Sequence, residues 1–194
     1  DNRNISMDEL LKAMEANFEA YDQLRHDLIY ETPKYGNDDD YADQHAVFVF
    51  NTFYDAINGK PTYRGGKYRI NMLPTTSHVY FGSVMKATPD GRKAFEPLSE
   101  GISPFQGADK KGPTAVLKSA AKIDHIKTGG TLLNQKFSPS FFKDDKSIEK
   151  LGQLVRSYFR MDGHHIQFNV VSAKTLRDAQ KHPEKYTDLI VRVA

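Results

Sequence analysis

The run His164-His165-Ile166-Gln167-Phe168-Asn169-Val170-Val171 predicts a strand with two different faces, because polar and apolar residues alternate along it. One face carries the apolar residues Ile166, Phe168 and Val170. The opposite face carries His165, Gln167, Asn169 and Val171. Buried amide side chains need hydrogen-bond partners, because an unpaired amide costs free energy. We therefore expect an interior loop to pack against the polar face and supply partners.

Three other stretches have the residue pattern of strands: residues 68–73, 131–137 and 186–194. Helical periodicity and capping residues predict helices over about residues 7–28, 38–58, 79–85, 113–123, 147–160 and 172–180. Ser6 and Glu9 form a capping box at the first of them. This alternation is typical of an α/β layer architecture. With no internal repeat or linker, residues 1–194 are predicted to form a single unit.

Two segments between these elements have no periodicity. Pro89-Asp90-Gly91 predicts a tight turn within residues 87–92. Residues 97–112 are rich in Gly, Pro and Ser and predict a long loop. Long ordered loops in compact domains are often functional.

The composition excludes several classes of protein. The chain has 194 residues, of which 39% are hydrophobic and 27% charged, as in ordinary soluble proteins. Its net charge of +2 indicates neither a nucleic acid nor an anionic membrane as partner. It has no signal segment and no apolar run of the ~20 residues that a membrane span needs, so we expect a cytoplasmic protein. The absence of cysteine excludes disulfides, cysteine-ligated metal and a thiol nucleophile within these residues.

The best candidate for small-molecule contacts is Thr75-Thr76-Ser77-His78. It follows the predicted strand 68–73, and α/β folds place ligand groups at the carboxyl ends of strands. Three hydroxyl groups and an imidazole suit a polar substrate. A purely local role is the alternative, in which these residues cap the helix predicted at 79–85.

Three other patterns are interpreted as structural. Asp38-Asp39-Asp40 would cap a helix, because adjacent residues on a helix cannot converge on one metal ion. Residues 107–112 have the glycine spacing of a phosphate loop, but Pro113 stands where that motif needs lysine. His164 and His165 would point to opposite faces of their strand, so no metal site is predicted.

Several stretches together resemble the C-terminal part of glycyl radical enzymes of the pyruvate formate-lyase superfamily. They occur in order along nearly the whole chain, at residues 33–38, 89–92, 97–104, 112–116, 130–136, 164–170 and 192–194. The resemblance is to the branch of dehydratases and C–N lyases. Residues 70–82 and 161–165 are most similar to the hydroxyproline dehydratases.

The closing stretch, residues 186–194, becomes apolar and β-branched and then stops on Arg192-Val193-Ala194. These three residues resemble the start of Arg-Val-x-Gly-Tyr, the signature that carries the radical glycine. We therefore expect a chain truncated just before the glycyl radical loop. The resemblance also implies that the piece alone is catalytically inert. Expressed alone, it should expose apolar faces and associate.

The resemblance implies the fold and partners of a complete enzyme. The fold is a ten-stranded α/β barrel, in which a glycine loop and a cysteine loop meet. The radical is installed after translation by an S-adenosylmethionine-dependent iron–sulfur activating enzyme, and the full-length protein is expected to be a homodimer. No metal or organic cofactor is expected in this chain, and Gln167, Asn169, Arg192, Val193 and Ala194 would lie near the radical loop.

The function implied is radical dehydration of trans-4-hydroxy-L-proline by C–O cleavage. Thr75 and Thr76 would bind the substrate, with Thr75 as a hydrogen-bond donor. The alternatives within the superfamily are glycerol or propanediol dehydratase and choline C–N lyase. A different class is a non-catalytic partner that replaces a damaged C-terminus, and another is a binding module that uses residues 75–78.

Overall fold

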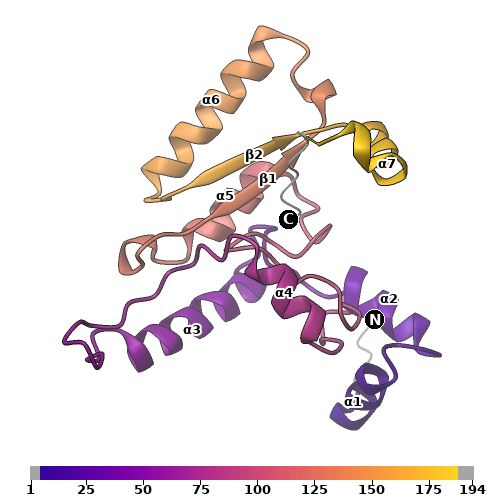
Figure 1. Ribbon diagram of the computed structural model, residues 1–194, viewed down its shortest axis with the longest axis vertical. Helices are drawn as coiled ribbons and strands as arrows, with labels where there is room; N and C mark the ends of the chain where they lie inside the picture. The colour runs from indigo at the N-terminus through magenta and orange to yellow at the C-terminus, as the bar shows by residue number, and fades with distance from the viewer. Residues whose placement is uncertain (1–4, 188–194) are drawn as a thin grey trace.

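The sheet of this protein is small and parallel. The computed structural model describes residues 5–187, in which β1 (Leu133–Phe137) pairs in parallel with β2 (Ile166–Val170). The register runs from Leu133 opposite Ile166 to Phe137 opposite Val170. Parallel neighbours need a crossover connection, and α6 (Asp145–Arg160) supplies it (Figure 1).

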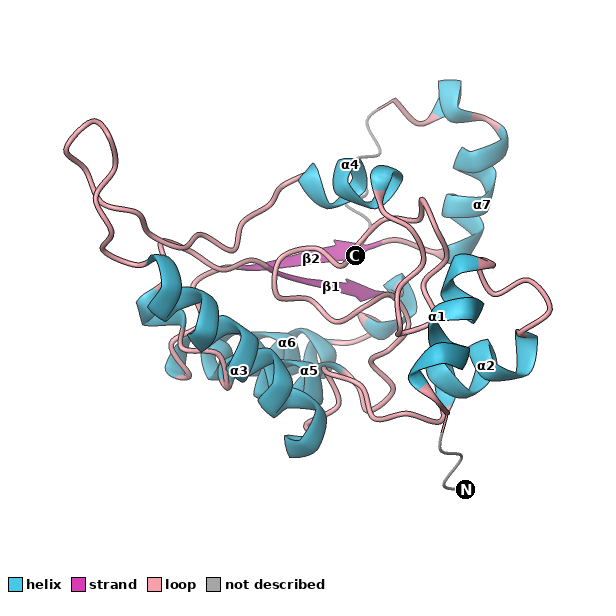
Figure 2. Cartoon of the chain, turned by 90° about the horizontal axis from the view of Figure 1, so that it is seen from below, coloured by secondary structure: helices cyan, strands magenta, loops and turns pink. Residues whose placement is uncertain are grey.

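The remaining helices surround this unit. They are α1 (Met7–Glu15), α2 (Asp22–Tyr30), α3 (Asp40–Ile57), α4 (Ser77–Val84), α5 (Pro113–Ala121) and α7 (Ala173–Lys181). Short 3-10 turns occupy His125–Lys127, Pro139–Phe141 and Pro183–Lys185. Figure 2 shows α3, α5 and α6 on one side of the strands and α4 on the opposite side. No helix among residues 5–187 is long and apolar enough to span a membrane.

The prediction of a strand at residues 68–73 is wrong, although this segment does lie beside the chain that leads into β1. Only one parallel bridge forms, between Met72 and Thr131. Met72 N donates to Gly130 O at 2.8 Å, and Leu132 N donates to Met72 O at 3.2 Å. Pairing stops there because the chain at Ile102 takes over this edge of β1.

The single helix predicted over residues 7–28 is also wrong. It divides into α1 and α2, and between them Asn17, Phe18 and Ala20 have left-handed φ angles of 51°, 61° and 64°. The break folds the chain back, so that Phe18 is only 1% exposed in a second apolar cluster with Leu28. Burial of this ring offsets the cost of the left-handed backbone. The capping box is confirmed at its first bond, since Glu9 N donates to Ser6 Oγ at 3.1 Å.

The strand predicted for the end of the chain finds no support in the two of its residues that the structure describes. Tyr186 follows the 3-10 turn Pro183–Lys185, and its hydroxyl donates to Asp178 Oδ2 at 2.6 Å. Residues 188–194 lie outside the described residues. The predicted position of Arg192-Val193-Ala194 is therefore untested.

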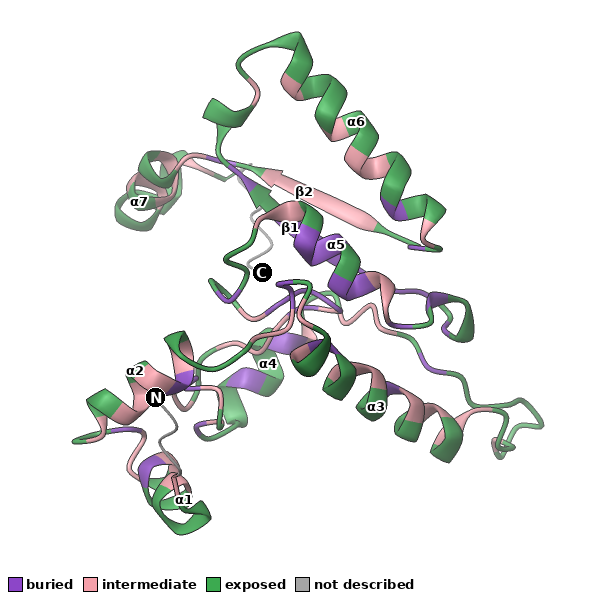
Figure 3. Ribbon diagram, turned by 180° about the vertical axis from the view of Figure 1, so that it is seen from behind, coloured by how far each residue is buried: buried purple, intermediate pink, exposed green. Residues whose placement is uncertain are grey.

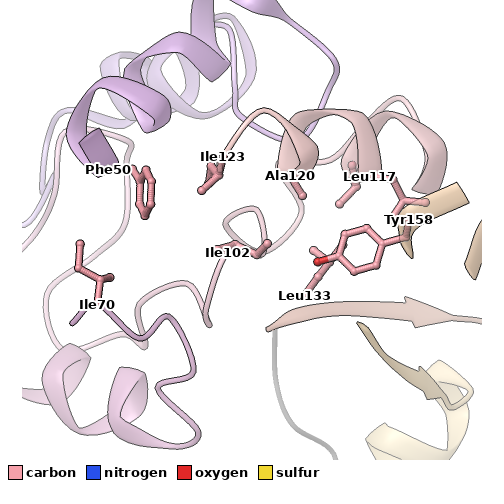
Figure 4. Packing of buried hydrophobic residues seen from close by; sticks show 9 residues of the cluster. Phe50, Ile70, Ile102, Leu117, Ala120, Ile123, Leu133 and Tyr158 are labelled. Atoms are coloured by element: carbon pink, nitrogen blue, oxygen red, sulfur yellow. The ribbon is translucent and has the colours of Figure 1, made fainter. Parts of the chain in front are cut away.

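The main apolar core lies between the strands and the helices α3, α5 and α6. Figure 4 shows Leu117, Leu133 and Tyr158 grouped at one end of this core, with Phe50 at the other end. The full cluster consists of Phe50, Ile70, Ile102, Val116, Leu117, Ala120, Ile123, Leu133 and Tyr158. Ile102 comes from the predicted loop 97–112, so that loop is part of the core.

Buried polar contacts hold the loop 97–112 in place. Tyr35 Oη donates to Ile102 O at 2.9 Å. Asn37 Nδ2 donates to Ala108 O at 2.8 Å, and its Oδ1 accepts from the backbone N–H groups of Lys110 (2.7 Å) and Lys111 (3.0 Å). These bonds replace the secondary structure that the loop lacks, because buried backbone groups must be paired.

The tight turn predicted at residues 87–92 is confirmed, and a buried arginine stabilises it. Gly91 N donates to Thr88 O at 3.1 Å, and Thr88 N donates to Arg92 O at 3.1 Å. The Arg92 side chain, 1% exposed, donates to the carbonyl oxygens of Lys86 (2.5 Å) and Glu96 (2.6 Å). A guanidinium with several fixed donors can hold such a turn without a carboxylate partner.

Gly101 predicts a sharp difference between two glycine substitutions. Both Gly101 (φ 58°) and Gly107 (φ 74°) are left-handed, but a Cβ on Gly101 would lie 2.3 Å from Leu132 O, whereas Gly107 faces open space. In the full-length protein, Gly107→Ala should cost about 1–2 kcal/mol of unfolding free energy. Gly101→Ala should cost about 1–3 kcal/mol more, because it pushes the loop off β1.

Urea unfolding and hydrogen exchange of the β1 amides would measure this difference. Equal losses of stability for the two variants would show that the contact between loop and strand is not needed.

Candidate functional site

The two faces of the sheet differ in chemistry, as the alternation in the sequence predicts. Leu133 and the half-buried Ile166 pack against the core under α5 and α6. Asn134 lies opposite Gln167 in the register, and Lys136 lies opposite Asn169. Because side chains alternate along a strand, these four polar residues share the other face. This face, Asn134, Lys136, Gln167 and Asn169, is called the polar face below.

A buried carboxylate meets the polar face. Glu100 has no exposed surface, and its Oε2 accepts from Asn134 Nδ2 at 2.6 Å. Three residues later, Ser103 Oγ accepts from Asn134 N at 2.9 Å. Hydrogen bonds to a carboxylate are short and strong, which offsets part of the cost of burying it. The loop 97–112 thus meets the polar face at Asn134 of β1. The partners predicted for Gln167 and Asn169 on β2 stay a prediction.

Sequence reasoning did not identify Glu100 or Asn134 as site residues. Part of the signal was present, since Glu100 is one of two acidic residues of a predicted functional loop and precedes a glycine. Asn134 is a polar residue within a predicted strand. Nothing local in the sequence shows that the two residues meet across 34 positions.

The side chains directly behind β1 are neutral. Burial raises the pKa of Tyr158 to about 12. Burial, and then the neighbouring His164, lowers the pKa of His125, whose Nδ1 lies 2.7 Å from Thr131 Oγ1. Both side chains are therefore uncharged near neutral pH. Lys136 lies on the polar face, and the carboxyl group of Glu100 lies beside it.

Thr75 and Thr76 are exposed and precede α4. Thr75 is left-handed with φ 55°, which is rare for a β-branched residue, and its Oγ1 donates to Pro74 O at 2.7 Å. In the alternative interpretation, these residues cap the helix. Thr76 does occupy the N-cap position of α4, but its side chain does not cap the helix.

The next residues anchor α4. His78 is 5% exposed, and its backbone carbonyl accepts from Leu98 N at 3.2 Å. One turn later, a Cβ on Gly82 would lie 2.4 Å from Glu96 O, so only glycine permits this close packing. The segment that supports α4 thus leads directly into Glu100. Among residues 5–187, neither ring nitrogen of His78 has a hydrogen-bond partner.

The acidic run at residues 38–40 has a structural role. Asp39 caps α3 by accepting from Tyr41 N at 3.0 Å. Asp38 binds Lys118 at 2.8 Å, and Asp40 binds Lys122 at 2.7 Å. Within residues 5–187, no group of histidine and acidic side chains is arranged to hold a metal ion.

Two backbone N–H groups of the glycine-spaced loop at residues 107–112 are not free to bind a phosphate. The amides at Lys110 and Lys111 already donate to Asn37.

Residues 98–194 match the family model described as glycine radical, and residues 1–82 match the one described as pyruvate formate lyase-like. The chain belongs to the glycyl radical enzyme family.

Among the relatives of this glycyl radical enzyme chain, a trans-4-hydroxy-L-proline dehydratase of Clostridioides difficile is 57% identical over 194 residues. The match covers 100% of this chain and 25% of that protein. The crystal structure of hydroxyproline dehydratase from Clostridioides difficile, with trans-4-hydroxy-L-proline bound, matches with a TM-score of 0.93 over 97% of this chain and 24% of that one. The glycerol-bound B12-independent glycerol dehydratase of Clostridium butyricum is 44% identical with a TM-score of 0.89, over 100% and 25% of the two chains.

The chain thus spans about a quarter of the length of these glycyl radical enzymes. Its predicted α/β architecture is confirmed as a portion of their barrel fold. The glycine radical match begins at Leu98, so the contact of Glu100 with Asn134 and the whole polar face lie within it. Thr75 and Thr76 lie within the pyruvate formate lyase-like match.

The predicted radical-loop residues are only partly described. Gln167 and Asn169 are half-buried on the polar face, so they are less enclosed than the buried strand interpretation implied. Arg192, Val193 and Ala194 lie outside the described residues. No described contact tests the role of any of the five.

The 2.6 Å contact of Glu100 with Asn134 predicts a pH-dependent variant. Asn134→Asp in the full-length protein would place two carboxylates together, which raises the folded-state pKa of the pair above the unfolded values near 4. The folded protein then holds a proton that the unfolded chain releases. Its stability should therefore fall as pH rises from about 4 to 7, by about 1.4 kcal/mol for each unit of pKa difference.

Urea unfolding at several pH values would measure this slope. Adding Glu100→Gln to Asn134→Asp should remove it. A slope equal to that of the unsubstituted protein would contradict the contact.

Proposed function

We propose that residues 1–194 are one unit of a larger glycyl radical dehydratase that removes the hydroxyl group of trans-4-hydroxy-L-proline. The observation that carries the proposal is the 57% identity to a trans-4-hydroxy-L-proline dehydratase, which extends over the whole chain. The match of 0.93 in TM-score to a structure with that substrate bound supports it. The polar face, with the buried Glu100 beside it, suits a substrate that carries hydroxyl, amine and carboxylate groups.

In this proposal, the residues of this chain bind and orient the substrate. Thr75 offers an exposed hydroxyl whose only described bond is local, and its left-handed backbone is the kind of strain that clusters at functional sites. Thr76 offers a second hydroxyl that is not used in capping. Glu100 holds Asn134 in one orientation on the polar face. Gln167 and Asn169 would contact the radical loop.

The chain contains no cysteine, so it cannot supply a thiyl radical itself. A glycyl radical, installed after translation by an S-adenosylmethionine-dependent activating enzyme, would supply the hydrogen abstraction. We propose that the full-length protein works in the cytoplasm as a homodimer.

A polyol substrate is the second candidate, because glycerol dehydratase aligns over all of this chain at 44% identity. Anaerobic activation of the full-length protein, followed by parallel assays of hydroxyproline, glycerol, propanediol and choline, separates the candidates. Turnover of glycerol without turnover of hydroxyproline would overturn the first proposal.

Substitution of Thr75 tests the substrate contact. Thr75→Val keeps the shape but removes the hydroxyl, so kcat/KM for hydroxyproline should fall about 10–100-fold, as expected for the loss of one hydrogen bond to substrate. Thr75→Ser should retain most activity. Thr52→Val is the matched control, because the Thr52 hydroxyl donates only to Phe48 O within α3. Full activity of Thr75→Val would exclude the contact.

A further inference from the structure

An ordered arm projects from the end of α3. Figures 1 and 2 show this arm, residues 59–69, extending away from the rest of the fold. Pro61 and Lys67 form an antiparallel bridge, and Tyr68 N donates to Lys60 O at 2.9 Å. Thr62 closes the tip, because its N donates to Gly66 O at 2.8 Å and its Oγ1 accepts from Gly66 N at 3.1 Å. Hydrogen bonds within the arm therefore hold its shape.

The arm carries four cations and no carboxylate. They are the exposed residues Lys60, Arg64, Lys67 and Arg69. The sequence has no Asp or Glu between Asp55 and Asp90. Within residues 5–187, none of the four cations forms an ion pair. Their positive field is therefore not neutralised within the described chain.

The tip also presents an aromatic side chain. Tyr63 is 90% exposed. The Arg64 guanidinium lies 5.3 Å from the centre of its ring, and Arg64 Nε donates to Tyr63 Oη at 2.7 Å. Tyrosine and arginine are the residue types that contribute most to protein interfaces. Their mutual contact fixes both side chains before binding, which lowers the entropy that binding costs.

The arm differs from the surfaces that suit permanent burial. Figure 3 shows exposed stretches along α3 and α4. Large apolar side chains are exposed there, such as Phe48 and Phe53 on α3 and Tyr80 and Val84 on α4. Contacts that hold one folded chain together resemble those apolar faces, whereas reversible contacts between proteins are more polar. The arm has no aliphatic side chain apart from Pro61. Its chemistry therefore fits a reversible contact.

We propose that residues 59–69 are a docking arm for a separate protein with a carboxylate-rich surface. Charge complementarity carries this choice of partner, because four unpaired cations and a tyrosine meet no anion in the described chain. Nucleic acid and membrane fit less well. The chain as a whole carries 25 acidic against 27 basic residues, whereas binding to a phosphate backbone is favoured by a strongly basic surface.

Charge reversal in the full-length protein tests the arm. The variant Arg64→Glu/Lys67→Glu is compared with Lys174→Glu/Arg177→Glu, which makes the same charge change at two exposed residues of α7. The probe is a labelled poly-glutamate peptide, followed by fluorescence anisotropy. The arm variant should bind about tenfold more weakly, and the α7 variant should bind like the unsubstituted protein. Equal affinities for the two variants would overturn the proposal.

Tyr63→Ala is a second test that keeps the charge of the arm, and it is needed if the charge-reversed variant does not fold. It should also weaken binding of the peptide, and unchanged binding would count against docking. Oligothymidylate and phosphatidylserine vesicles are tested in parallel. If the DNA or the vesicles bind more tightly than poly-glutamate, and the arm variant loses that binding, the proposal of a protein partner is wrong. Light scattering tests whether the partner is a second copy of the same protein. If the unsubstituted protein has the mass of a dimer and the arm variant does not, the arm contacts the second copy, and the proposal of a separate partner is wrong.

Discussion

The structure depends on the second edge of β1. A strand exposes backbone groups along both edges, and inside a protein each of them needs a partner. The strand β2 satisfies one edge. Met72 bonds to the chain just before β1 on the other edge, and Ile102 and Ser103 bond there to Leu132 and Asn134. This requirement draws an irregular loop into the core and brings Glu100 against Asn134.

The fold was predictable where its determinants are local. The alternation of residues 166–170 gave the two faces of β2 correctly, because the period of two is a property of any strand. The strand at residues 68–73 failed because its pairing depends on which segment reaches β1 first, and Ile102 competes for the same edge. The helix over residues 7–28 failed because the apolar spacing continues through Phe18, although its backbone turns left-handed there.

The candidate site was predictable in part for the same reason. Gln167 and Asn169 follow from the strand period alone, and the run of hydroxyl residues at Thr75 follows from its place after an extended segment. Glu100 and Asn134 were missed because their importance arises from a contact between a loop and a strand. The radical chemistry was inferred from the resemblance to glycyl radical enzymes, and the family match confirms that resemblance; neither periodicity nor composition indicates a radical reaction.

The bonds from Asn37 to the loop 97–112 have a consequence for synthesis on the ribosome. Asn37 binds Lys110 across 73 positions, and Asp43 binds Lys122 across 79. The amino-terminal helices therefore leave the ribosome long before their partners exist, and their apolar sides stay open in that interval. Long-range contacts of this kind slow folding and expose the nascent chain to aggregation. A longer delay before Lys110 and Lys122 are synthesised would therefore increase the need of the nascent chain for chaperones.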